Sequence, residues 1–260
     1  MTDLKIAFFD IDGTLIDMEK KQITAKMVET LHRLQKNGVR ICIATGRAPA
    51  ELPEIDGVDF DAFLTYNGSY CYDREGRTIF ANPISPEDVD TLLSNAAALG
   101  RPVMLATRDR LLANGRDRDL VDYAAIAKVE VQVAPDFEQV RRQETIFQLM
   151  LGSREAEHAR LMQGVKNAKI AGWWDRAVDV IPGNGGKGIG IEKMLEFYGY
   201  TPEQAIAFGD GNNDIEMLQA VGTGVAMANG SDRLKAVATT VCGFCAEDGI
   251  YHYCVENGLI

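Results

Sequence analysis

The sequence predicts an α/β protein with a parallel sheet, interrupted by an inserted α+β segment. Three observations predict this class. Short apolar runs alternate with helical patterns near both ends of the chain, the connections between them are short, and the middle carries apolar runs in adjacent pairs. Alternating strands and helices indicate parallel strands, whereas paired strands indicate hairpins and an antiparallel sheet.

The N-terminal part has a strand–helix–strand pattern. Residues 6–9 form a short apolar run that is typical of a buried strand. Residues 24–37 carry apolar side chains at helical spacing, and Gly38 is a suitable residue to end this helix. Further strands are expected at 39–44 and 62–66, which makes this part the start of a parallel sheet.

The C-terminal part resumes the alternation. A strand is expected at 178–181, a helix at 188–198 and a strand at 205–208, followed by a helix at 213–220 and a strand at 224–227. The elements after residue 182 are expected to complete the sheet that the N-terminal part begins.

The middle of the chain has a different organisation. Ser85 and Pro86 start a helix that is expected to end at Gly100. The remaining elements are strands near 102–107, 110–114, 129–133, 145–151, 168–174 and 177–181, and helices near 118–127 and 154–164. The strands occur in pairs, so we expect an antiparallel sheet with helices on one face, inserted as a second domain over 83–181. Residues 1–82 and 182–260 then form the first domain.

Composition excludes several classes of function. The net charge of −11 argues against nucleic acid as a partner, because phosphate backbones require clustered Lys and Arg. It leaves a small phosphorylated substrate open, because one metal ion and a fixed cation reverse the local sign of charge. The apolar runs are too short to span a membrane and the N-terminus lacks the apolar region of a signal peptide, so we expect a cytoplasmic protein without a membrane partner.

Polar residues follow four of the expected strands. They are Asp10 and Asp12, the stretch 45–47, the loop that contains Lys187, and the stretch 210–214. In open parallel sheets ligands bind beyond the carboxyl ends of the strands, so these residues are expected to meet at one edge. Together they provide acids for a divalent cation, a hydroxyl group, a lysine and glycine-rich backbone, which suit phosphoryl transfer.

These stretches resemble the four motifs of the haloacid dehalogenase (HAD) superfamily. Asp-Ile-Asp-Gly-Thr-Leu at 10–15 is similar to the first motif, Thr45 to the second, Lys187 to the third and Gly-Asp-Gly-Asn-Asn-Asp at 209–214 to the fourth. The long insertion resembles the cap of the Cof-type sugar-phosphate phosphatases (class IIB), as do Tyr-Asn-Gly at 66–68 and Val-Ala-Met-Ala-Asn at 225–229. The resemblance implies a Rossmann-like core with an α+β cap.

The resemblance also implies roles in catalysis. Asp10 would be the nucleophile that forms an aspartyl phosphate, and Asp12 would be the general acid and base. Mg²⁺ is the implied cofactor, and its ligands would come from Asp10, Asp12, Asp210 and Asp214. For Asp214 the alternative is that it orients Lys187. Residues implied to bind the substrate phosphate are Thr45, Gly46, Lys187 and Asn213. Candidates for contacts to the leaving group are Arg47, Asn67, Arg108, Trp173, Trp174 and Arg176.

The implied function is a magnesium-dependent phosphatase for small phosphomonoesters, with sugar phosphates as the expected class of metabolite. We expect a monomer or a small homo-oligomer. A phosphosugar mutase of the same superfamily stays open, and so does a phosphate-binding protein without enzyme activity.

Two motifs suggest other classes of function. The G-x-G-x-x-G pattern at 183–188 is compatible with a dinucleotide-dependent oxidoreductase. Cys242 and Cys245, with His252 nearby, suggest a zinc or redox site, although their spacing does not fit the usual zinc modules and reduced thiols are expected.

Overall fold

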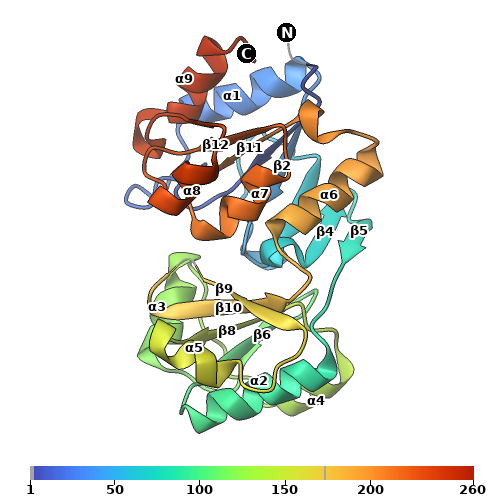
Figure 1. Cartoon of the computed structure of the whole chain (residues 1–260), viewed down its shortest axis with the longest axis vertical. Helices are drawn as coiled ribbons and strands as arrows, with labels where there is room; N and C mark the ends of the chain where they lie inside the picture. The colour runs from blue at the N-terminus through green and yellow to red at the C-terminus, as the bar shows by residue number, and fades with distance from the viewer. Residues whose placement is uncertain (1–2, 173) are drawn as a thin grey trace. The chain divides into compact units, whose positions relative to one another are not determined.

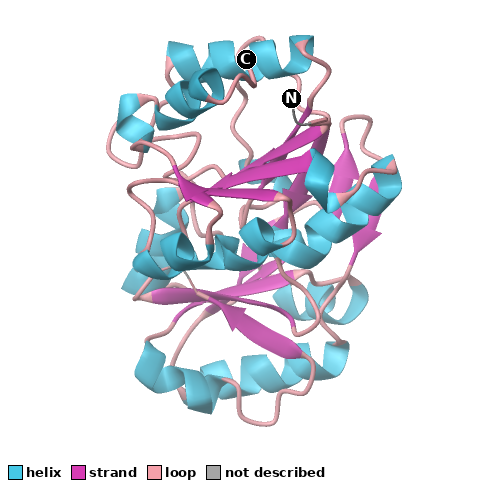
Figure 2. Cartoon of the chain, turned by 45° about the horizontal axis from the view of Figure 1, so that its top comes forward, coloured by secondary structure: helices cyan, strands magenta, loops and turns pink. Residues whose placement is uncertain are grey.

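The computed structural model describes residues 3–172 and 174–260, and these residues form two compact units (Figures 1 and 2). The first unit comprises Met1–Thr45, Pro53–Phe80 and Lys187–Ile260, and the second comprises Gly46–Leu52 and Ala81–Gly186. The expected insertion at 83–181 lies inside the second unit. The segment 46–52 also joins this unit, where the Gln148 side-chain amide donates to the Gly46 carbonyl over 3.2 Å.

The first unit contains an eight-stranded sheet in the order β13-β12-β11-β1-β2-β3-β4-β5. From β13 to β3 every pair is parallel, whereas β4 runs antiparallel to β3. The strands are β1 (Ile6–Phe9), β2 (Arg40–Ala44), β3 (Ala62–Thr65), β4 (Tyr70–Asp73), β5 (Thr78–Ala81), β11 (Ala205–Gly209), β12 (Thr223–Ala226) and β13 (Thr240–Val241). The predicted α/β class with a largely parallel sheet is confirmed.

Helices cover both faces of this sheet. On one face, side chains of the strands such as Phe8 and Leu64 pack in one core with side chains of three helices. The helical residues include Ile191, Met217 and Leu234. These helices are α6 (Lys187–Tyr198), α7 (Ile215–Gln219) and α8 (Asp232–Val237).

The opposite face is built around the remaining strand residues. Phe9 and Phe208 stack there at 5.2 Å, and Tyr253 meets Phe208 edge-on. Tyr253 lies on α9 (Gly249–Glu256), which contacts α1 (Ala25–Lys36), and the two helices lie side by side in Figure 1. The predicted end of α1 is confirmed, because Gly38 adopts a positive φ of +81° directly after the helix.

The second unit contains a five-stranded antiparallel sheet in the order β7-β6-β8-β10-β9. The strands are β6 (Val103–Ala106), β7 (Leu111–Ala113), β8 (Gln148–Gly152), β9 (Ala168–Ala171) and β10 (Ala177–Pro182). Helices α2 (Pro86–Ala98), α4 (Phe137–Gln143) and α5 (Glu155–Leu161) pack on one face. α3 (Arg118–Ile126) lies against the other face, where the Tyr123 hydroxyl donates to Asp179 over 2.7 Å.

Four details differ from the sequence-based expectation. The helices of the antiparallel sheet were expected on one face only, but α3 covers the other face, where Tyr123 bonds to Asp179. The strand expected at 129–133 is wrong, because within the described residues this stretch forms only an isolated bridge between Ala113 and Val133. The left-handed residue Lys128 (φ +61°) and Pro135 flank the stretch and leave too little extended backbone for a ladder. Helix α4 and the β4–β5 pair were not expected from the sequence. No described helix has the length and apolarity to cross a bilayer.

The strand before Lys187 belongs to the second unit. The strand expected at 177–181 is β10, which pairs antiparallel with β8 and β9, so the loop at 183–187 does not follow a strand of the parallel sheet. A dinucleotide fingerprint requires a parallel β-α-β unit at this place. The oxidoreductase alternative is therefore wrong, and the glycines of this loop have no such role.

Asp119 of α3 is the centre of an ion-pair cluster in the second unit. It accepts hydrogen bonds from Arg154 (2.7 Å), Arg176 (3.0 Å) and Arg101 (3.1 Å). The hydrogen bonds from Arg154 and Arg176 in particular hold its pKa well below the usual range of an aspartate. We expect Asp119→Asn to lower the free energy of unfolding at pH 7 by about 1–3 kcal/mol, because three guanidinium groups lose their shared carboxylate.

Chemical denaturation of wild type and variant between pH 7 and pH 3 measures this loss. A lowered carboxyl pKa stabilises the fold above the unfolded-state pKa of about 3.9 and loses this effect as pH falls toward the folded-state value. The difference between wild type and variant should therefore persist at pH 5 and shrink in stronger acid. Asp109→Asn is the control, since this carboxylate is exposed and its nearest cation is at 3.8 Å; an equal loss in both variants would contradict the role of the cluster.

Candidate active site

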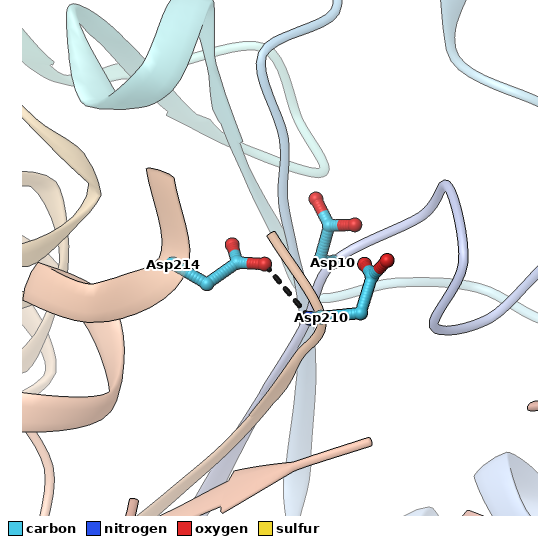
Figure 3. A group of neighbouring side chains, drawn as sticks. All are labelled: Asp10, Asp210 and Asp214. Atoms are coloured by element: carbon cyan, nitrogen blue, oxygen red, sulfur yellow. Dashed lines mark hydrogen bonds between the residues drawn. The ribbon is translucent and has the colours of Figure 1, made fainter. Parts of the chain in front are cut away.

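Three aspartates meet at the carboxyl edge of the parallel sheet. Asp10 and Asp210 directly follow the neighbouring strands β1 and β11, and the amide of Asp10 continues the ladder with a 3.0 Å bond to the Phe208 carbonyl. Asp214 reaches the same place from the short turn before α7. Each of the three offers an oxygen within 4.8 Å of the others, and Figure 3 shows their carboxylates around one space.

Lys187 is the buried cation beside these acids. Its ammonium lies 2.6 Å from Asp10 Oδ1 and 2.5 Å from Asp214 Oδ1, and its side chain is fully buried. It is the first residue of α6, so the helix start fixes the base of the side chain. The interaction with the two acids raises its pKa, although burial alone would lower it. Lys187 is therefore a fixed positive charge.

Asp214 has both carboxylate oxygens engaged. Oδ1 accepts from Lys187, and Oδ2 accepts from the backbone amides of Asp210 (3.0 Å) and Gly211 (2.9 Å); the bond to Asp210 is the dashed line in Figure 3. This arrangement suits a residue that orients Lys187 and shapes the turn after β11. Sequence reasoning offered both metal binding and orientation of Lys187 for Asp214, and the contacts support orientation.

The site has three aspartates and one lysine, and the pKa values of Asp10 and Asp210 are raised. Burial raises the pKa of Asp10 to about 7; Lys187 opposes this rise, whereas Asp214 and Asp12 add to it. Burial, together with Asp10 and Asp214, raises the pKa of Asp210 to about 8. Asp12 lies two residues after Asp10 in the same loop, and its negative charge adds to the rise in the pKa of Asp10. The site thus holds more negative charge than Lys187 compensates.

The loop after Asp10 supports Asp210 through contacts that sequence reasoning missed. The Thr14 hydroxyl donates to Asp210 Oδ1 over 3.2 Å, and the side-chain amide of Asn229 donates to the Gly13 carbonyl over 2.8 Å. Gly13 has a φ of +89°, and a Cβ there would lie 2.2 Å from Asp210 Oδ2. Only glycine fits this position. These partners are about two hundred residues apart in the chain, so spacing gives no signal for them.

A second group of expected residues lies around β3. Thr45 is buried, and its carbonyl accepts a hydrogen bond from the backbone N–H of Asn67 over 2.9 Å. The side-chain amide of Asn213 donates to Asn67 Oδ1 over 3.0 Å. The structure therefore joins Asn67 to Thr45 and Asn213, two residues expected to bind phosphate.

Other expected contacts lie in the second unit and have partners there. Arg47 donates to the Glu51 carbonyl (3.0 Å), and Gly46 accepts from Gln148. Arg176 pairs with Asp119 and lies 4.7 Å from the Trp174 ring, which stacks on Tyr123. The Arg108 guanidinium lies 3.8 Å from the Asp109 carboxylate, and Trp173 lies outside the described residues.

The five cysteines are free. Burial raises the pKa of both Cys242 and Cys245 to about 12, which keeps them as thiols. Cys245 donates to the Thr14 carbonyl over 3.1 Å, and Cys242 lies 3.4 Å from the sulfur of Met227. These contacts show packing under the loop of the first motif and give no support to the zinc or redox hypothesis.

The donor set fits a hard divalent cation. Asp10 and Asp210 offer carboxylate oxygens close to one another; burial raises the pKa of both, and repulsion from Asp10 raises that of Asp210 further. Carboxylate oxygens are the ligands that Mg²⁺ prefers, and a bound dication would relieve this repulsion. The residues present are therefore suited to hold Mg²⁺.

A strand-end acid cluster, a buried lysine and a hydroxyl around one sheet edge define an enzyme of phosphoryl transfer. The chain belongs to the haloacid dehalogenase-like hydrolases, whose family model matches residues 7–254. It is 32% identical to the putative phosphatase YkrA of Bacillus subtilis over 99% of both chains. It is 27% identical to the pyridoxal phosphate phosphatase YbhA of Escherichia coli, over 96% of this chain and 97% of that protein.

A solved structure supports the same assignment. The HAD subclass IIB sugar phosphatase BT4131 has a TM-score of 0.88 at 28% identity, covering 98% of this chain and all of that one. The predicted superfamily, its Cof-type branch and the fold of a Rossmann-like core with a separate antiparallel sheet are confirmed. The protein is a phosphatase that acts on phosphate monoesters.

Proposed function

We propose that this protein is a magnesium-dependent phosphatase that hydrolyses small sugar phosphates through an aspartyl phosphate on Asp10. The first unit would be the catalytic core and the second the cap that selects the leaving group. The observation that carries the proposal is the contact of buried Lys187 with buried Asp10 and Asp214, beside the partly buried Asp210, at one sheet edge. The names of the related phosphatases support a small metabolite as substrate.

The reaction would proceed in two steps. In the first, Asp10 attacks phosphorus while Asp12 gives its proton to the leaving oxygen, which departs as an alcohol. In the second, Asp12 takes a proton from water as the water attacks the aspartyl phosphate, which releases inorganic phosphate and restores Asp10. Lys187 would stabilise the negative charge that develops on the phosphoryl oxygens, and Thr45 and Asn213 would orient them.

Mg²⁺, held by Asp10 and Asp210 with the Asp12 carbonyl, would neutralise charge between the nucleophile and the phosphoryl group. The nucleophile must be ionised, and burial raises the pKa of Asp10 to about 7 without a metal. Without a metal, Asp10 would therefore be only partly ionised at neutral pH. This is the reason to expect that activity depends on the metal.

Phosphate release from p-nitrophenyl phosphate, with Mg²⁺ and with EDTA, tests the reaction class. We expect release with Mg²⁺ and none with EDTA, followed by a ranking of substrates on a panel of sugar phosphates and other phosphometabolites. Folded wild-type protein that releases phosphate from neither the ester nor the panel would contradict the proposal. Equal rates in EDTA would contradict the metal requirement alone.

Binding of Mg²⁺ should stabilise the fold, most strongly at alkaline pH. Asp10 and Asp210 have raised pKa values, so the folded state binds more protons than the unfolded state between about pH 4 and their folded-state values near 7 and 8. In EDTA the free energy of unfolding should thus fall as pH rises through this range. Mg²⁺ at about 100 times its Kd should raise the Tm by about 5–10 °C at pH 8.

Thermal unfolding at pH 5.5 and pH 8, with Mg²⁺ and with EDTA, measures this effect. The metal-induced rise in Tm should be smaller at pH 5.5, where protons occupy the carboxylates. Asp210→Asn should reduce the rise at both pH values. An equal rise in this variant would show that Mg²⁺ stabilises the protein at another place.

A further inference from the structure

The turn Tyr66–Gly68, directly after β3, has an unusual backbone. Three consecutive residues have positive φ angles: +51° at Tyr66, +51° at Asn67 and +90° at Gly68. Only glycine adopts this region freely; asparagine tolerates it, and an aromatic residue is disfavoured there. Tyr66 and Asn67 are both about 99% buried, so the surrounding structure must hold the turn in place.

This turn contacts three of the segments that carry the proposed active site. The backbone N–H of Asn67 donates to the Thr45 carbonyl over 2.9 Å. The side-chain Oδ1 of Asn67 accepts from the side-chain amide of Asn213 over 3.0 Å. Helix α6, whose first residue is Lys187, packs directly on the turn: a Cβ on Gly190 would lie 3.1 Å from the Gly68 Cα. The turn thus joins the phosphate-binding residues through contacts inside one compact unit.

The bond between the two asparagines also has a direction. A side-chain amide has a donor end and an acceptor end, and Asn67 presents its acceptor to Asn213. Asn213 must therefore turn its NH₂ group toward Asn67, and its Oδ1 lies back over Gly211, where a Cβ would be only 2.4 Å away. An NH₂ group has two hydrogens. One is used by Asn67, and under the proposed function the other would donate to a phosphoryl oxygen.

We propose that Asn67 is a positioning residue, which fixes the orientation of the Asn213 amide relative to Thr45 rather than contacting the leaving group. This inference rests on the proposed function and assigns Asn67 a role at the same site. The left-handed turn places the buried Asn67 carboxamide, which follows β3, against the turn after β11. Backbone strain that is retained at such a place is typical of functional sites.

Two substitutions separate the carboxamide from the backbone conformation. Asn67→Gly removes the carboxamide and favours the left-handed turn, whereas Asn67→Ala removes the carboxamide and disfavours the turn. If Asn67 is present only because asparagine tolerates this conformation, Asn67→Gly should be as active as wild type. If the carboxamide positions Asn213, both variants should lose about 10- to 100-fold in kcat/KM on p-nitrophenyl phosphate, the range expected for a misplacement of roughly 1 Å.

The double variant Asn67→Gly/Asn213→Ala provides the test of coupling. Its kcat/KM should lie within about 3-fold of that of Asn213→Ala alone, because the first residue acts only through the second. Effects that multiply would overturn the proposal, and so would full activity of Asn67→Gly. Lys21→Gly is the matched control, since Lys21 is another non-glycine residue with a positive φ (+52°), and it should keep wild-type activity.

Binding of orthovanadate in the presence of Mg²⁺, measured by calorimetry, distinguishes this inference from the proposed function. An inactive wild type would refute the proposed function, and the Kd of orthovanadate would still test the positioning role. We expect Asn67→Gly to weaken this binding as much as Asn213→Ala does, with a Tm close to that of wild type. Wild-type affinity in Asn67→Gly would overturn the inference.

Discussion

Replacement of Asp10 by asparagine is expected to reduce phosphate release by at least about 10⁴-fold, since the amide has the shape of the carboxylate but is not a nucleophile. The fold should survive. Burial raises the pKa of Asp10 to about 7, so the ionised side chain opposes folding at pH 8 in the absence of metal. Asp10→Asn removes this charge and keeps an oxygen that can accept from Lys187. Its Tm in EDTA should therefore be no lower than that of wild type.

Steady-state kinetics with p-nitrophenyl phosphate and acid quenching of a single turnover check this expectation. Wild type should form a covalent phosphoenzyme that the variant lacks. Asp17→Asn is the control: this carboxylate follows the same motif, but it accepts from the backbone amides of Glu19 and Lys20 and should be dispensable for turnover. More than about a tenth of wild-type activity in Asp10→Asn would rule out Asp10 as the nucleophile.

The sequence predicted correctly the elements whose capping residues and apolar spacing match the way the element packs in the fold. α1 has an N-cap at Thr24, apolar residues at helical spacing and Gly38 after its end. The strand expected at 129–133 has the right residue types, but it lacks a neighbouring ladder, and that depends on where other segments lie. Strand pairing is a tertiary property, and alternation of apolar residues alone does not determine it.

The candidate site was predictable residue by residue but not contact by contact. The four motifs pointed to Asp10, Lys187 and Asp210, because these residue types suit phosphoryl transfer and the motifs occur in the order and spacing of the haloacid dehalogenase superfamily. The bond from Thr14 to Asp210 and the link between Asn67 and Asn213 join segments from distant parts of the sequence. These partners come together only in the folded chain, so their roles can be inferred only from the distances in the structure.

Lys187→Met is expected to have the largest combined effect on activity and stability. Lys187 is the cation that bridges Asp10 and Asp214, and all three side chains are buried. Removing one member of a buried ion pair costs about 3–5 kcal/mol, because the remaining charges lose their compensation. Activity should fall by about 10³-fold, the upper range for loss of one group that stabilises the transition state.

The loss of stability should depend on pH. Lys187 lowers the pKa of Asp10, so without the lysine this folded-state pKa rises further above the unfolded-state value. A carboxyl group with a raised pKa binds more protons in the folded state, and the free energy of unfolding then falls as pH rises between the two values. The difference from wild type should accordingly be larger at pH 8 than at pH 5, as measured by denaturation in EDTA.

Lys193→Met is the matched control, because Lys193 lies on the same helix, is exposed and pairs only with Glu196 among the described residues. Its substitution should change the free energy of unfolding by less than about 0.5 kcal/mol at either pH. Mg²⁺ should restore part of the stability of Lys187→Met, because the dication also compensates the acids, but it should not restore activity. A variant that regains full turnover with Mg²⁺ would show that Lys187 serves the fold alone, since charge on the phosphoryl group would then need no fixed cation.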